Sequence, residues 1–159
     1  MTISPMNIRP AAEGEARLLS ALAMRAKAHW GYSAEALEAW RSELAVSPED
    51  IQAKPTFVAV EGDDVVGFYS LSPSRRSWEL DNLWVSPPFM HQGVGRALLS
   101  HALDTAARGG AVEVTVDADP NAEQFYLECG AVRRGEVPAP IPGQPARVRP
   151  QLAFHERTT

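Results

Sequence analysis

One segment, Glu79 to Leu99, constrains the fold of this chain more than any other part of the sequence. A strand-like run leads through Pro87 and Pro88 into a Gly-X-Gly turn, Gly93 and Gly95, which opens directly into a helical pattern. Glycine leaves the backbone accessible and tolerates conformations that other residues avoid. The first turn of a helix has unpaired N–H groups and a positive dipole end. The segment therefore predicts a strand–turn–helix unit with a cradle for a phosphate or pyrophosphate.

Other interpretations of the same turn fit it less well. A dinucleotide-binding turn has a third glycine three residues after Gly95, where this chain has Leu98. A Walker-type loop requires Gly-Lys-Ser/Thr, whereas Gly95 is followed by Arg96 and Ala97. A plain strand-to-helix turn that binds no ligand stays open from this segment alone.

A second segment, Asp119 to Ala131, helps to decide between a ligand-binding turn and a plain strand-to-helix turn. Pro120 and Asn121 can open a helix there, and Gly130 can end it. With the strand WELDNLWVSP, the turn MHQGVGRALL, the helix NAEQFYLECGA and the following VRRGE, the chain resembles the GNAT N-acetyltransferase superfamily. The resemblance covers Trp78 to Glu136, and the hairpin FVAVEGDDVVGFYSL of that superfamily precedes it.

The pattern of elements predicts an α+β fold in a single domain, residues 1–159. The expected strands are Asn7–Arg9, Thr56–Glu61, Val65–Ser70, Ser77–Val85, Ala111–Asp117, Val132–Gly135 and a last edge strand Gln151–His155. The expected helices are Glu13–His29, Ser33–Leu44, a turn from Ser47, Val94–Arg108 and Ala122–Glu128. The resemblance implies one mixed, mostly antiparallel twisted sheet flanked by helices. Two strands, Ser77–Val85 and Ala111–Asp117, would splay apart to hold coenzyme A.

The resemblance also implies acetyl-CoA as co-substrate and assigns its contacts. Backbone amides would hold the pyrophosphate at His91, Gln92, Gly93, Val94, Gly95 and Arg96. The family usually begins this motif with Arg or Gln, and Met90 stands there in this chain. The strand residues Leu83, Trp84 and Val85 would run beside the pantetheine arm, and their N–H groups would polarise the thioester carbonyl. Asn121 and Phe125 are assigned to the same cofactor, with a helix N-cap and a core aromatic as their respective alternatives.

Transfer to an amine requires a base and an acid. An alkylammonium group has a pKa of about 10.4 and must lose a proton before it attacks. Glu79 and Asp81 face the same side of a strand, so either carboxylate can accept that proton, and Glu79 is preferred. A water chain or a backbone carbonyl is the alternative to both. Tyr126 matches the superfamily tyrosine that commonly protonates the leaving thiolate, and its alternative is a core aromatic.

The acceptor side carries aromatic residues at a break between the first two helices, His29, Trp30, Tyr32 and Trp40. Trp30 and Tyr32, with Trp78, are the predicted substrate-binding residues because aromatic faces attract an amine cation. Core and lid packing is the alternative for all of them. His91 and His101 have no metal-ligand spacing with any acidic or cysteine partner, so no metal is expected.

Composition limits the partners and the compartment. The net charge of -5 argues against nucleic acid. No apolar run reaches the roughly 20 residues of a membrane span, and the N-terminus lacks the pattern of a secretion signal. Cys129 is the only cysteine, so an internal disulfide is excluded. We expect a cytoplasmic protein, and the resemblance allows a homodimer.

Two functions from different classes agree with these observations. The first is an acetyl-CoA-dependent N-acetyltransferase acting on a small primary amine or a protein amine. The second is a non-catalytic acyl-CoA-binding sensor or interaction module with the same fold. The acidic pair on the strand and Tyr126 favour the enzyme, since a module that only binds does not need them.

Overall fold

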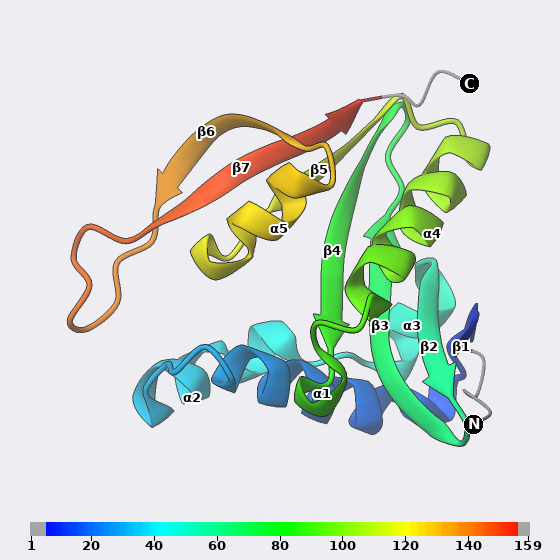
Figure 1. Cartoon of the computed structure of the whole chain (residues 1–159), viewed down its shortest axis with the longest axis horizontal. Helices are drawn as coiled ribbons and strands as arrows, with labels where there is room; N and C mark the ends of the chain where they lie inside the picture. Colours follow the sequence, from blue (N-terminus) through cyan, green and yellow to red (C-terminus); the bar gives the residue numbers. More distant parts are fainter. Residues whose placement is uncertain (1–5, 156–159) are drawn as a thin grey trace. The chain divides into compact units, whose positions relative to one another are not determined.

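The computed structural model describes residues 6–155, and Figure 1 traces them in chain order. The strands are β1 (Met6–Pro10), β2 (Thr56–Glu61), β3 (Asp64–Ser72), β4 (Ser77–Val85), β5 (Glu113–Asp117), β6 (Val132–Pro138) and β7 (Val148–His155). The α-helices are α1 (Ala16–Ala28), α2 (Ala34–Leu44), α3 (Pro48–Ala53), α4 (Val94–Arg108) and α5 (Glu123–Glu128). Short 3-10 helices occur at Glu13–Glu15, Pro87–Phe89 and Pro120–Ala122.

Across the described residues the strands form one mixed sheet in the order β1-β2-β3-β4-β5-β7-β6. The chain divides into two compact units. Unit 1 comprises Met1–Leu71 and Asn82–Ala102, and unit 2 comprises Ser72–Asp81 and Leu103–Thr159. β4 and α4 each contribute one part to either unit. The predicted α+β class and mixed sheet are confirmed.

Unit 1 is organised around a hairpin covered by α1. β2 pairs antiparallel with both β1 and β3. The apolar stripe of α1, which includes Leu19 and Leu22, packs with Val58 of β2, Phe68 of β3 and Ile51 of α3 in one buried cluster. Such a stripe, recurring at three- and four-residue intervals, is what makes this segment a helix on a sheet. Trp84 packs against the edge of the same cluster.

Gly67 fixes the position of the first part of α4 within unit 1. A Cβ at this glycine would lie 2.8 Å from the Trp84 carbonyl oxygen and 2.9 Å from Leu98 Cδ1. Val94 Cγ1 would be 3.3 Å away. Only a residue without a side chain allows β3, β4 and the start of α4 to approach this closely. The packing therefore holds the N-terminus of α4 at the end of β4.

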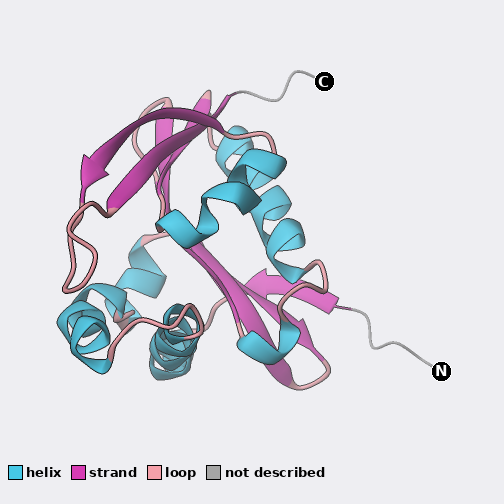
Figure 2. Ribbon diagram, turned by 60° about the vertical axis from the view of Figure 1, so that its left-hand side comes forward, coloured by secondary structure: helices cyan, strands magenta, loops and turns pink. Residues whose placement is uncertain are grey.

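Unit 2 consists of the start of β4, the end of α4, β5, α5 and the β6–β7 pair. β4 pairs in parallel with β5 from Ser77–Glu113 to Glu79–Thr115. β7 pairs antiparallel with β5 on one side and β6 on the other. Figures 1 and 2 show β6 and β7 side by side as a long curved pair.

The last strand differs from its prediction. β7 begins at Val148 and lies between β5 and β6, so the expectation of an edge strand was wrong. β6 extends to Pro138, three residues past its predicted end, and takes the edge position instead. β6 and β7 pair antiparallel across the proline-rich segment, and β7 is the strand of this hairpin that also pairs with β5.

Helix boundaries agree closely with local sequence signals. Ser33 caps α2 by accepting a hydrogen bond from the Ala36 N–H at 3.1 Å. Ser47 and Asp50 form a reciprocal capping box at α3. α4 ends before Gly110, whose φ of +100° belongs to the left-handed region. Among the described residues, each helix is too short or too polar to cross a bilayer.

Candidate active site

The turn before α4 leaves the first backbone amides of the helix without helical acceptors. His91 and Gly93 both have positive φ, +63° and +88°, which reverses the chain after the Pro87–Phe89 turn. The first helical bond of α4 runs from the Ala97 N–H to the Gly93 carbonyl at 3.0 Å. The amides before Ala97 have no acceptor within the helix, as at any helix start. These N–H groups form the positive end of the α4 helix dipole.

The space around Gly93 in this turn is open. Gly93 is exposed, and a Cβ built on it would meet no atom within 4 Å. Val94 is buried and anchors the helix, whereas the Arg96 side chain is exposed and free to add charge. Gln92 is also exposed, and its Nε2 donates to the Pro88 carbonyl at 3.3 Å. The turn therefore presents the Gly93 backbone and two polar side chains, Gln92 and Arg96, to solvent.

The end of β4 is held in place by a polar chain inside unit 1. The Trp84 indole N–H donates to Asn82 Oδ1 at 3.0 Å. Asn82 Nδ2 donates in turn to Ser70 Oγ at 2.8 Å. The strand ends where the Ser86 N–H donates to the Val66 carbonyl at 2.8 Å. Leu83, Trp84 and Val85 are half-buried within this frame.

Aromatic residues of unit 1 gather at the α1–α2 connection, as the sequence predicted. The Trp30 ring lies 5.9 Å from the Trp84 ring, tilted by 50°. Tyr32 and Trp40 meet edge to face, with centroids 4.8 Å apart. All four rings are half-buried, so they combine packing with a solvent-accessible surface. Trp84 thus connects the end of β4 to the aromatic residues of the connection.

Tyr126 lies on α5 in unit 2 and is buried, with 6% of its surface exposed. The rings of Phe125 and Phe154 lie 5.4 Å and 6.3 Å from it. Burial raises the pKa of the Tyr126 phenol above its usual range, and the nearby Cys129 and Asp119 act in the same direction. The phenol is therefore neutral at physiological pH and carries a proton that it can donate.

The strand carboxylates of β4 lie in unit 2 and differ in environment. Glu79 is exposed, at the position of β4 that pairs with Thr115. Asp81 is half-buried, and the Ser72 hydroxyl donates to its Oδ2. An exposed carboxylate can exchange a proton with water, and a hydrogen-bonded one is oriented. Both remain candidates for the base.

Trp78, the third predicted substrate-binding residue, is packed within unit 2. Its side chain is buried, and a Cβ on Gly109 would lie 2.4 Å from Trp78 Cη2. The indole therefore packs closely against the glycine that follows α4. Trp30 and Tyr32 are more exposed than Trp78, and all three stay predicted substrate-binding residues.

Asn121 is exposed at the start of the helical segment that carries Tyr126. The cap of this segment is Asp119, which accepts hydrogen bonds from the Asn121 N–H at 2.8 Å and from Asn121 Nδ2 at 3.0 Å. Arg147 in turn donates to Asp119 at 3.3 Å and to the Ala139 carbonyl at 3.0 Å. This buried ion pair was not predicted, because 28 residues separate its partners and no local pattern joins them.

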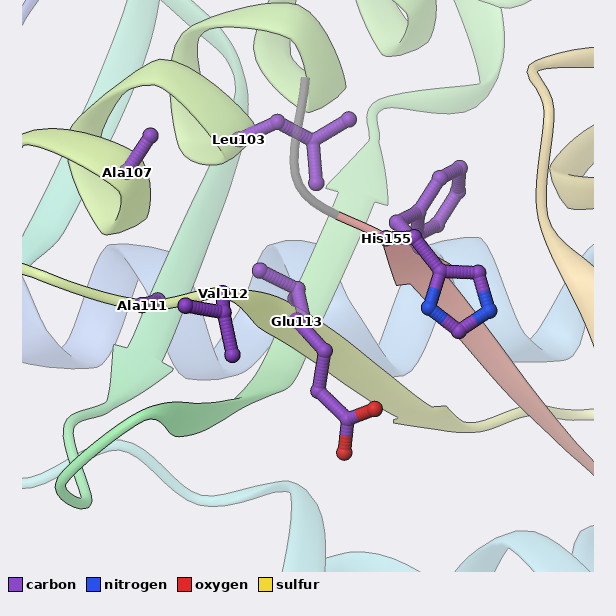
Figure 3. Close-up of a pocket in the computed structure, with 8 residues that line it drawn as sticks. Leu103, Ala107, Ala111, Val112, Glu113 and His155 are labelled. Atoms are coloured by element: carbon purple, nitrogen blue, oxygen red, sulfur yellow. The ribbon is translucent and has the colours of Figure 1, made fainter. Parts of the chain in front are cut away.

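A small apolar pocket lies elsewhere in unit 2. It is lined by Leu103, Ala107, Ala111, Val112, Glu113, Val114, Phe154 and His155. Figure 3 shows the Glu113 carboxylate pointing away from Leu103. Ser77 Oγ and Arg134 both donate to this carboxylate, and Arg134 is the main reason that the pKa of Glu113 is lowered. The pocket contains none of the predicted site residues.

Comparisons with known proteins identify the class to which this protein belongs. The chain is similar to the PaiA N-acetyltransferase of Thermoplasma acidophilum in complex with coenzyme A, with a TM-score of 0.77 and 19% identity over 95% of this chain and 99% of that one. It is also similar to the acetyl-CoA complex of YncA, a putative acetyltransferase of Salmonella typhimurium, with a TM-score of 0.71 and 20% identity over 98% and 96%. Apo YjaB of Escherichia coli gives a TM-score of 0.69 and 27% identity over 96% and 99%. No curated relative matches the chain.

These likenesses define the fold as that of an N-acyltransferase. The family model for the acetyltransferase (GNAT) family matches residues 17–131, well over half of the sequence. The chain belongs to the GNAT acetyltransferase family.

Proposed function

We propose that the chain transfers an acetyl group from acetyl-CoA to a primary amine by direct attack. The observation that carries this proposal is the start of α4, where backbone amides without a helical acceptor follow Gly93 in an open, left-handed turn. The unpaired N–H groups of such a turn are suited to bind a diphosphate. Membership of the family and the CoA and acetyl-CoA held by two similar structures support the same donor.

Each candidate residue has one task in binding the donor. The amides of residues 91–96 hold the diphosphate, with Arg96 as a nearby cation. The backbone of residues 83–85 offers N–H groups to the thioester carbonyl and the pantetheine arm. Asn121 and Phe125 contact the same arm. Acetyl-CoA supplies an activated acyl group, which makes a metal unnecessary.

Proton transfer is assigned to unit 2. Glu79 removes the proton of the amine, directly or through water, and Asp81 is the second candidate. Tyr126 gives its proton to the leaving thiolate. Burial keeps the Tyr126 phenol protonated, and the same rise in its pKa makes it a weaker acid toward the thiolate. The neutral phenol also donates a hydrogen bond to developing negative charge on sulfur.

A second candidate function is supported by the same residue. Burial of Tyr126 makes its phenolate costly, which suits a structural phenol in a non-catalytic acyl-CoA-binding module. The enzyme and the module differ in whether acyl-CoA is consumed. They do not differ in whether acyl-CoA binds.

The deciding experiment titrates the full chain with acetyl-CoA and with free CoA by calorimetry, and then screens a broad panel of amines for thiol release. Binding followed by amine-dependent thiol release supports the enzyme. Binding of CoA without thiol release by any amine, in wild type and in Tyr126→Phe alike, supports the module. Absence of binding to either form of CoA contradicts both functions.

A further inference from the structure

The ammonium group of one lysine lies among three aromatic rings at the α1–α2 connection of unit 1. Lys27 Nζ lies 4.4 Å from the ring centroid of Trp40, 5.2 Å from that of Tyr32 and 6.0 Å from that of Trp30. We call these three rings the aromatic cage. All three distances fall within the range of cation–π attraction, about 6 Å.

The cage and the lysine inside it come from three different segments. Lys27 is in the last turn of α1, Trp30 and Tyr32 flank Gly31 in the connection, and Trp40 is on α2. Gly31 has a φ of +86°, which turns the chain so that residues on both sides of it face the same cation. Tyr32 and Trp40 stand at 84° to each other and form a corner.

One wall of the cage is supported from behind, and the cage remains accessible. Trp30 rests on Trp84, which is fixed through its indole N–H by Asn82. Lys27 and the three rings are half-buried, so solvent reaches the cage. Three aromatic faces around an ammonium are the arrangement by which proteins recognise alkylammonium ligands.

We propose that the aromatic cage is a binding site for the alkylammonium group of the acceptor, and that Lys27 is an internal occupant which the incoming amine displaces. This inference rests on the proposed function for the identity of the ligand. It names the acceptor class as a cationic alkylamine. An amine that binds must exchange with the Lys27 ammonium, so its apparent affinity is reduced by the fraction of time that Lys27 fills the cage.

The test uses n-butylammonium as the probe, because it reproduces the lysine side chain beyond Cα, with 1-butanol as its neutral counterpart. Calorimetric titration of the full chain without acetyl-CoA is compared among wild type, Lys27→Met and Lys27→Arg. We expect Lys27→Met to bind n-butylammonium about tenfold more tightly than wild type, equivalent to about 1.4 kcal/mol. Lys27→Arg keeps a cation in the cage and should bind as weakly as wild type. 1-Butanol should bind none of them measurably.

Two further variants separate the cage from general charge effects. Arg25→Met removes an exposed cation from the same helix and should leave n-butylammonium affinity at the wild-type value. Trp40→Phe, added to Lys27→Met, keeps an aromatic ring but weakens the strongest cation–π face, and should remove most of the tenfold gain. Equal affinity in wild type and Lys27→Met, or full retention of the gain after Trp40→Phe, overturns the proposal.

Binding of acetyl-CoA is measured on the same proteins. Lys27→Met with normal acetyl-CoA affinity but no gain for n-butylammonium overturns the cage alone. If wild type does not bind acetyl-CoA while Lys27→Met still binds n-butylammonium more tightly than wild type, the proposed function is overturned and the cage remains as an amine site.

Discussion

The indole N–H of Trp84 donates to the side-chain oxygen of Asn82, two residues earlier on β4, at 3.0 Å. This bond sets the orientation of the ring that contacts both the core of unit 1 and Trp30. Asn82 is fixed on its other side by Ser70. A short polar chain between neighbouring strands therefore determines how an aromatic residue stands at the end of β4.

Asn82→Ala should lower the free energy of unfolding by about 1–2 kcal/mol, because it leaves a half-buried indole N–H without its acceptor. Urea denaturation measures the change. In the Trp84→Phe background the same substitution should cost less, by about 1 kcal/mol, since Phe has no N–H to satisfy. An identical cost in both backgrounds would show that the bond contributes nothing. Gln124→Ala, at an exposed hydrogen bond of α5, is the control and should change stability by less than about 0.5 kcal/mol.

Gly93→Glu should abolish CoA binding while the fold persists. The carboxylate adds like charge at the anion cradle, and a side chain at φ +88° strains the backbone by about 1–2 kcal/mol. Calorimetry with CoA measures the first effect and thermal unfolding the second. Gly143→Glu is a matched control, because Gly143 has a φ of +83° and no atom within 4 Å of a built Cβ. It should lose similar stability and keep CoA affinity. Normal CoA affinity in Gly93→Glu would refute this placement of the diphosphate.

The elements around Gly93 could be predicted because their signals are local. Gly-X-Gly opens α4 and Gly109-Gly110 closes it, and its predicted bounds, Val94–Arg108, are those of the structure. The serine caps of α2 and α3 are equally local. Each of these residues acts on backbone groups within one helical turn of itself. The helix ends can therefore be predicted from the sequence without knowing the tertiary fold.

Features that depend on distant residues could not be predicted in this way. The position of β7 between β5 and β6 is set by pairing partners in two other strands. The aromatic residues of the α1–α2 connection were recognised, but the place of Lys27 among them depends on the phase of α1 at its last turn. The cap at the start of the Tyr126 segment was assigned to Asn121 as an alternative, whereas Asp119 performs it.

Tyr126→Phe should lower kcat for amine acetylation at least tenfold without changing acetyl-CoA affinity, if the phenol protonates the leaving thiolate. Loss of one hydroxyl leaves the surrounding aromatic packing intact. Steady-state thiol release gives kcat, and calorimetry gives the affinity. Unchanged kcat would assign Tyr126 to packing alone. Phe125→Leu should instead lower stability, with any effect on kcat following from displacement of its neighbour.

Tyr126 also predicts how stability depends on alkaline pH. An unfolded tyrosine ionises near pH 10, and burial raises the pKa of Tyr126 in the folded chain. Above pH 10 the unfolded chain binds fewer protons than the folded one, so the free energy of unfolding falls as pH rises. This group alone contributes a slope of about 1.4 kcal/mol per pH unit there. Urea denaturation of wild type and Tyr126→Phe on both sides of pH 10 isolates the slope, which the variant should lack. Parallel curves would contradict the burial of the phenol.

Arg147 anchors the proline-rich connection between β6 and β7 to the start of the Tyr126 segment. Its ion pair with Asp119 is buried, with 4% and 5% of the two side chains exposed. Arg147→Met should lower the free energy of unfolding by about 3–5 kcal/mol, because it leaves the Asp119 carboxylate buried without its cation. Urea denaturation measures the loss.

The matched control for Arg147 is Arg149, which pairs with Asp117 at 2.8 Å on the surface of the same unit. Both side chains of that pair are about two-fifths exposed, 43% and 41%, so Arg149→Met should cost less than about 1 kcal/mol. The two variants remove the same charge from the same strand region, and they differ in the burial of the carboxylate left behind. Equal costs would show that Asp119 is hydrated in solution. A much larger cost at Arg147, with part of it recovered by adding Asp119→Asn, would show that the uncompensated charge is the cause.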